Sequence, residues 1–155
     1  MKELIDVFNH LSLLPSLKLE SGVYEQILNK KVDELSGYNH IDIEIKNNLK
    51  KTVLVLPKLR TLPSELSHLL YDIETICIDI IDHLENSTSH TELIKKTEKA
   101  RAIMEKIDRV LYTYIAEDPK LYFKYCIVIK DIYNRLGNIL ERLRETKMAG
   151  GGIEN

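Results

Sequence analysis

The sequence contains few of the residues that phosphate-binding loops and nucleophilic active sites require. It has six glycines, three of them together at 150–152. No G-x-x-x-x-G-K-[ST] or G-x-S-x-G motif is present, which argues against a phosphate-cradling loop and against a hydrolase of the nucleophile-elbow type. Only two cysteines occur, Cys77 and Cys126, both within apolar runs and without a C-x-x-C or Cys/His pattern. We expect both to be buried, unreactive hydrophobic residues.

Long apolar runs are also missing. No segment approaches the length that would cross a bilayer, and the first residues lack the apolar core of a signal peptide. The sequence therefore predicts an intracellular protein, cytoplasmic or nuclear, without a membrane partner. The net charge of −2 gives no overall attraction to nucleic acid. Nucleic-acid binding through Lys and Arg on the helix faces is kept as a third hypothesis, and Arg135, Arg142 and Arg144 on the last helix are one possible basic contact surface.

The composition is that of a folded protein. The chain has 155 residues, of which 44% are hydrophobic and 30% charged, enough for one substantial core. We expect a single helical domain over residues 1–148. The glycine run after Ala149 predicts the end of the last helix, with a flexible tail over 149–155.

Three stretches carry apolar residues at alternating steps of three and four, which keeps one face of an α-helix turned toward a neighbour. These seams are Leu62, Leu66, Leu69, Ile73, Ile76, Ile80 and Leu84; Leu93, Thr97, Ala100, Met104, Ile107, Leu111 and Tyr114; and Tyr122, Tyr125, Ile129, Ile132, Leu136, Ile139 and Leu143. Short connections between them favour antiparallel neighbours. The sequence predicts an all-α fold, an antiparallel helical bundle of three long helices plus two or three shorter N-terminal helices.

Capping residues set the expected ends of the long helices. Pro63 stands near the first position of one helix, where proline is best tolerated. Ser89 and Glu92 fit a capping box at the start of the next. Asp118 followed by Pro119 predicts the end of that helix and the start of the last one.

The N-terminal third predicts shorter helices. One runs over Lys2–Leu14 and stops at Pro15, and a second runs from about Gly22 to Leu35 with Ser21 as its N-cap. Residues 41–46 are ambiguous, because isoleucine alternates there with charged residues as in a strand. No partner strand is apparent, so we interpret the segment as part of a helix that continues through Leu56.

One pattern resembles a metal site. Glu65 and His68 form an E-x-x-H step, and Asp79 and His83 lie one turn apart further along the same helix. Di-iron bundles require two such motifs and further glutamates, and the chain has one copy. A solvated helix face explains the four residues as well, so we predict no metal and no other cofactor.

Aromatic residues crowd around the Asp118–Pro119 turn, and the last helix is apolar on more than one face. In a structural interpretation these aromatic residues pack one end of the bundle. In a functional interpretation they form a partner-binding surface, since tyrosines are enriched in interface hot spots. The candidate partner-binding residues are Tyr112, Tyr122, Phe123, Tyr125, Tyr133 and Leu140.

No catalytic residue is predicted, and the favoured function is a non-enzymatic protein–protein interaction module, such as an adaptor, scaffold or assembly subunit. Its partner would be another protein or a second copy of the chain. The alternative is a small helical enzyme or ligand-binding bundle with an interior, metal-assisted site.

Overall fold

The protein is all-α. The computed structural model describes residues 1–16 and 22–154, with side chains through residue 147, and contains no strand in those residues. Six α-helices follow one another: α1 (Lys2–Leu11), α2 (Val23–Glu34), α3 (Ile43–Val55), α4 (Tyr71–Asn86), α5 (His90–Glu117) and α6 (Pro119–Glu154). Short 3₁₀ segments lie at Leu14–Ser16, Leu35–Gly37, Leu56–Leu59 and Ser64–Leu70.

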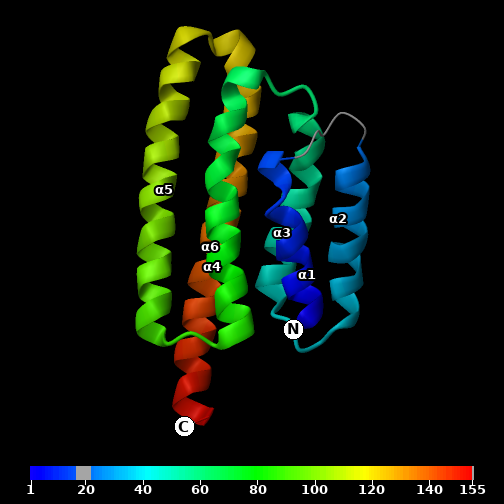
Figure 1. Ribbon diagram of the computed structural model, residues 1–155, viewed down its shortest axis with the longest axis vertical. Helices are drawn as coiled ribbons and strands as arrows, with labels where there is room; N and C mark the ends of the chain where they lie inside the picture. The colour runs from blue at the N-terminus through cyan, green and yellow to red at the C-terminus, as the bar shows by residue number, and fades with distance from the viewer. Residues whose placement is uncertain (17–21, 155) are drawn as a thin grey trace.

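The helices run alternately up and down in one bundle (Figure 1). Helix α5 packs along α6, α3 packs along the other side of α6, and α1 packs against α4, while α2 closes the far side against α1 and α3. The α5–α6 turn forms the upper end of the bundle. The N-terminus of α1 and the turn between α4 and α5 lie at the lower end (Figure 1).

The three predicted seams face the interior. Every residue of the three seams is buried or half-buried, and buried residues from Leu4 to Leu143 form one hydrophobic cluster. Helix α5 lies close to α6 at Gly137, where a Cβ atom would lie 2.8 Å from the Met104 Sδ atom. A side chain at this position would therefore require the flexible end of Met104 to shift.

The predicted caps at Ser89 and Asp118 are confirmed, whereas Pro63 precedes a 3₁₀ segment and not an α-helix. The Ser89 hydroxyl accepts a hydrogen bond from the Glu92 amide at 3.2 Å at the start of α5. The Asp118 carboxylate accepts one from the Leu121 amide at 3.2 Å, and Pro119 is the first residue of α6. These two turns join α4, α5 and α6 as antiparallel neighbours, as their short length predicts.

The ambiguous segment 41–46 is helical from Ile43, not a strand. The Asp42 carboxylate accepts hydrogen bonds from the Glu44 and Ile45 amides at 3.0 and 3.2 Å, which caps α3. Ile41 and Ile45 turn inward and Ile43 is exposed. The helical spacing therefore decides burial here, and the apparent alternation does not.

The first seam differs from the single α-helix that the sequence predicts. Residues Ser64–Leu70 form a 3₁₀ helix, and the α-helix begins only at Tyr71. Within this segment the Ser67 hydroxyl donates to the Ser64 carbonyl at 2.7 Å, and the Glu65 carbonyl accepts a hydrogen bond from the Tyr114 hydroxyl at 3.2 Å. The two hydroxyls thus donate hydrogen bonds to the Ser64 and Glu65 carbonyls, which in an α-helix would accept from backbone amides.

Both ends of the predicted domain differ in detail from expectation. Helix α1 ends at Leu11, and Pro15 lies in the following 3₁₀ turn. The proposed N-cap Ser21 lies outside the described residues, and the residue before α2 is Gly22 in a left-handed conformation (φ 74°).

The glycine run at 150–152 does not end the last helix, because α6 continues to Glu154. Glycine weakens a helix by about 1 kcal/mol per residue, yet it permits helical backbone angles once a long helix has formed.

No helix in the described part of the chain is long and apolar enough to span a bilayer.

Candidate partner-binding surface

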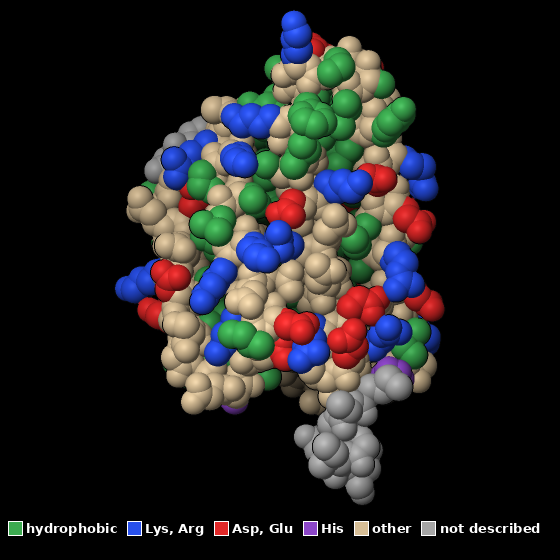
Figure 2. All heavy atoms as spheres, turned by 180° about the vertical axis from the view of Figure 1, so that it is seen from behind, with side chains coloured by type: hydrophobic (Ala, Val, Ile, Leu, Met, Phe, Trp, Pro, Cys, Tyr) green, Lys and Arg blue, Asp and Glu red, His purple; other side chains and the backbone are tan. Residues whose placement is uncertain are grey.

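The upper ends of α5 and α6 expose large apolar side chains that the bundle does not cover. Tyr112 is 76% exposed, Phe123 55% and Ile127 51%. These three residues, called here the α5–α6 surface, lie on the outward faces of the two helices. Figure 2 shows hydrophobic side chains gathered at this end of the molecule.

A shallow pocket gives the α5–α6 surface a definite shape. It has a volume of about 290 Å³ and lies between the two helices, with Tyr112 and Ile127 on its walls and Leu111, Ile115 and Cys126 also lining it. Two smaller pockets, of about 210 and 170 Å³, follow along the same pair of helices toward the lower end. The surface is therefore the apolar start of an interhelical groove.

Ion pairs cross the groove at the lower wall of this pocket, which Asp108 and Lys130 also line, and further toward the lower end. Lys130 Nζ lies 2.8 Å from Asp108 Oδ1, and Arg101 Nη2 lies 2.7 Å from Glu141 Oε1, each joining α5 to α6. Both pairs are largely exposed, so each contributes little to stability. The apolar contact area therefore lies above the Asp108–Lys130 pair, at the upper part of the pocket.

Positive charge flanks the α5–α6 surface on α6. Lys120, Phe123, Lys124 and Ile127 fall at steps of three, one and three, which places them on one face of the helix. Lys120 forms no ion pair with a described residue, and Lys124 lies 5.3 Å above the Tyr125 ring without a carboxylate partner. The apolar face therefore has unneutralised lysines on its rim.

The sequence-predicted partner-binding set divides into exposed and buried members. Tyr112 and Phe123 are exposed, whereas Tyr133 and Leu140 are fully buried in the core. The Tyr133 hydroxyl donates a hydrogen bond to the Leu69 carbonyl, and burial raises the pKa of this phenol. Tyr133 and Leu140 therefore pack the bundle and are not accessible to a partner.

Tyr122 is also buried, and it joins α6 to the 3₁₀ segment. Its hydroxyl donates to Glu65 Oε1 at 3.1 Å, and its ring packs edge-on against Tyr114 at 5.3 Å between centroids. Burial and the hydrogen bond to Glu65 raise the pKa of Tyr122. The same bond, together with one from its own backbone amide, lowers the pKa of Glu65.

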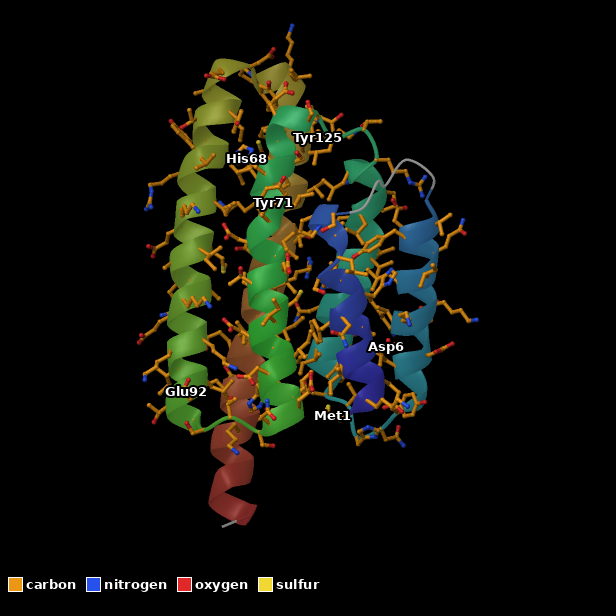
Figure 3. The ribbon with its side chains drawn as sticks, in the orientation of Figure 1. Met1, Asp6, His68, Tyr71, Glu92 and Tyr125 are labelled. Atoms are coloured by element: carbon orange, nitrogen blue, oxygen red, sulfur yellow. The ribbon has the colours of Figure 1, made fainter. Side chains whose placement is uncertain are left out.

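Tyr125 completes this arrangement. It is half-buried, and its hydroxyl lies 2.8 Å from the Thr61 hydroxyl on the connector before α4. Figure 3 shows Tyr125 and His68 near the upper end. The centroid of the His68 ring lies 6.3 Å from that of the Tyr114 ring. The tyrosine cluster (Tyr114, Tyr122, Tyr125 and Tyr133) is thus structural, with hydroxyls that attach the start of α4 and its connector to α5 and α6.

The four residues of the metal-like pattern do not converge. Glu65 is engaged by Tyr122, as described above. Asp79 Oδ2 lies 3.3 Å from Lys99 Nζ, and His83 Nδ1 lies 2.8 Å from the Thr88 hydroxyl. Within the described residues no group of three or more His, Cys, Asp or Glu side chains is arranged to hold a metal ion.

The two cysteines are buried and unpaired with each other. Burial raises the pKa of both the Cys77 and the Cys126 thiol, so neither side chain is an activated nucleophile. This agrees with the interpretation of both as small hydrophobic residues.

Lys120 and Lys124 were not identified from the sequence. Their positions, three residues before Phe123 and Ile127 on a predicted helix, could have shown that basic and apolar residues share one face.

No protein-family model, no curated protein and no solved structure matches this chain.

Proposed function

We propose that the protein is a helical interaction module that binds an amphipathic helix of a partner protein through the α5–α6 surface. The observation that carries this proposal is the exposure of Tyr112, Phe123 and Ile127, of which Tyr112 and Ile127 line a preformed pocket. Grouped large apolar side chains on an otherwise polar surface are typical of contact sites.

The shape of the surface favours a helix as the ligand. The pocket opens a groove between two antiparallel helices, and the apolar side chains of a third helix fit such a groove at steps of three and four residues. The upper groove is lined by Leu111, Ile115 and Ile127, which offer apolar contact to two or three such anchors.

The charge of the rim favours acidic flanks on that helix. Lys120 and Lys124 have no carboxylate partner in the described chain, so a partner with glutamates or aspartates beside its apolar face would be attracted and oriented. A basic partner helix would be repelled by the same lysines.

Two designed peptides test the proposal: an amphipathic helix with leucines on one face and glutamates beside them, and the same peptide with lysines in place of the glutamates. We expect the acidic peptide to bind the protein more tightly in a fluorescence titration. Equal binding of the two peptides, or binding of neither, would contradict the proposal.

Ile127→Ser should weaken binding of the acidic peptide about tenfold, because it removes one apolar anchor. Ile78→Ser is a matched control, since Ile78 on α4 is 52% exposed and Ile127 51%. Equal effects of the two substitutions would show that the peptide does not use the α5–α6 surface.

Charge reversal of Lys120 and Lys124 to glutamate should invert the preference between the two peptides. The same reversal of the exposed Lys50 and Lys51 on α3 should leave it unchanged. Sedimentation at increasing concentration completes the test: self-association lost in Ile127→Ser would identify a second copy as the occupant and overturn the proposed partner.

A further inference from the structure

A second pocket lies at the lower end of the bundle, opposite the α5–α6 surface. It has a volume of about 630 Å³, within the usual range for small-molecule sites. Residues at the starts of α1 and α3, the end of α4 and the second half of α6 enclose it, and Met1, labelled in Figure 3, lies at its rim.

Apolar side chains form most of the interior of this lower pocket. Leu4, Ile41, Ile45, Leu84 and Leu143 line it, and all but the half-buried Leu84 belong to the buried core. A pocket with such walls favours the apolar part of a ligand.

One charged side chain in the wall lacks a counter-charge. Lys46 is only 6% exposed, and its ammonium donates a single hydrogen bond, to the Tyr38 carbonyl at 2.5 Å. No described carboxylate forms an ion pair with it, and two of its three N–H groups have no described acceptor. A buried charge without a partner is costly, so a site of this kind favours an anion.

The other buried lysine shows what is missing. Lys96 is 8% exposed, and its ammonium donates to the Asp82 carboxylate at 2.6 Å and to the Asp79 carbonyl at 3.0 Å. The buried Lys96 thus has a carboxylate partner within the chain. The buried Lys46 has no such partner and faces a pocket instead.

The nearest acidic residue of the lower pocket is already engaged. Asp42 lines the pocket, but its carboxylate lies 2.9 Å from Arg142 Nη2 and caps the first turn of α3. Burial alone would raise the pKa of Asp42, and the hydrogen bonds from Arg142 and the helix amides lower it overall, so Asp42 is ionised at neutral pH. The ionised Asp42 repels any anion in the pocket, and it repels a doubly charged phosphate more than a singly charged carboxylate. The pocket therefore favours a ligand with a single negative charge.

We propose that the lower pocket binds an amphipathic monocarboxylate, with its carboxylate on the Lys46 ammonium and its hydrocarbon chain against Leu4, Ile45, Leu84 and Leu143. The carboxylate accepts hydrogen bonds from the two N–H groups of the Lys46 ammonium that have no acceptor in the described chain. The site is at the opposite end of the bundle from the α5–α6 surface and does not depend on the proposed partner.

The test compares decanoate with decanol and acetate on the full chain by calorimetric titration. We expect decanoate to bind at least about tenfold more tightly than decanol, which lacks the charge, and acetate, which lacks the chain, not to bind measurably. Equal binding of decanoate and decanol would overturn the proposal.

Lys46→Met retains the apolar stem of the side chain and removes the charge. This variant should lose the preference for decanoate over decanol, whereas Lys50→Met, one turn further along α3 and exposed, should keep it. Retention of the preference in Lys46→Met would overturn the assignment of the carboxylate to Lys46.

Methyl NMR of the unmodified protein locates the ligand independently of any variant. Decanoate should shift the methyl signals of Leu4, Leu84 and Leu143 and leave those of Ile127 and Ile78 unchanged. Shifts confined to Ile127 would place the fatty chain on the α5–α6 surface and contradict the lower pocket as its site.

Discussion

The two ends of the bundle solve the same packing problem in opposite ways. At the upper end the tyrosine cluster fills the interior and bonds to the start of α4, and the apolar side chains left over point outward. At the lower end an open pocket lies between the helix ends, and a lysine without a counter-charge lines it. A heptad-like seam fixes the contacts along a bundle, whereas the residues at each end decide whether apolar side chains stay exposed or a pocket opens between the helices.

The largest expected effect on the Tm comes from removing the partner of a buried charge at the upper end, so that this charge is left unpaired, as Lys46 is at the lower end. Glu25 on α2 is buried, and both of its carboxylate oxygens lie 3.0 Å from Arg60 Nε. Arg60→Ala would leave this carboxylate buried and unpaired, which we expect to lower the Tm by on the order of 5 °C or more. Thermal unfolding followed by circular dichroism measures the shift.

Lys58→Ala is the control for Arg60→Ala, because Lys58 is an exposed residue of the same connector. A Tm for Arg60→Ala that matches the control would mean that Glu25 needs no partner. The contrast between a paired upper end and an unpaired lower end would then fail.

The second prediction compares the two buried lysines directly. Lys96→Met removes the ammonium that pairs with Asp82 and should destabilise the protein by about 1–2 kcal/mol. Lys46→Met removes an unpaired charge in favour of an apolar side chain of similar length, and should be neutral or stabilise by up to about 1 kcal/mol. Urea unfolding of both variants gives the two free energies. A loss at Lys46 as large as that at Lys96 would show that Lys46 is already satisfied.

The smallest effect is a pH dependence at the upper end. The pKa of Glu65 is lowered from its ordinary value of 4.5 by its own backbone amide and by the Tyr122 hydroxyl. This contribution to stability is fully present above pH 4.5 and is lost as the pH falls through the lowered pKa. The difference in Tm between the unmodified protein and Tyr122→Phe should therefore narrow as the pH falls below 4.5.

Tyr112→Phe provides the control for that measurement, because Tyr112 is exposed and its hydroxyl has no described partner. Its Tm should follow that of the unmodified protein at every pH. A Tm difference for Tyr122→Phe that stays constant with pH would exclude Glu65 as the source of the effect.

The sequence was sufficient to predict the helices, their seams and the caps at Ser89 and Asp118, because these depend on local spacing and on side chains within one turn. It was not sufficient to separate Tyr133 and Leu140 from Phe123. All three are apolar residues of α6, and the packing of other parts of the chain on α6 decides which are covered; the Tyr133 hydroxyl, for example, reaches the Leu69 carbonyl.

The lower pocket was missed for a related reason. Lys46 and Lys50 are both lysines of α3, four residues apart, yet the first is buried and the second is exposed. That difference depends on where α1, α4 and α6 close around the start of α3. No spacing rule within a single helix contains this information.

The 3₁₀ opening of the first seam matches the length of that segment to its neighbours. At about 2.0 Å per residue its seven residues span roughly 14 Å, against about 10.5 Å for an α-helix. With the 16 residues of α4 the segment reaches about 38 Å, close to the roughly 42 Å of the 28-residue α5. Because a 3₁₀ helix rises further per residue, a shorter stretch of chain comes close to the length of α5, so an insertion of two or three residues before Tyr71 should favour ordinary α-helix there.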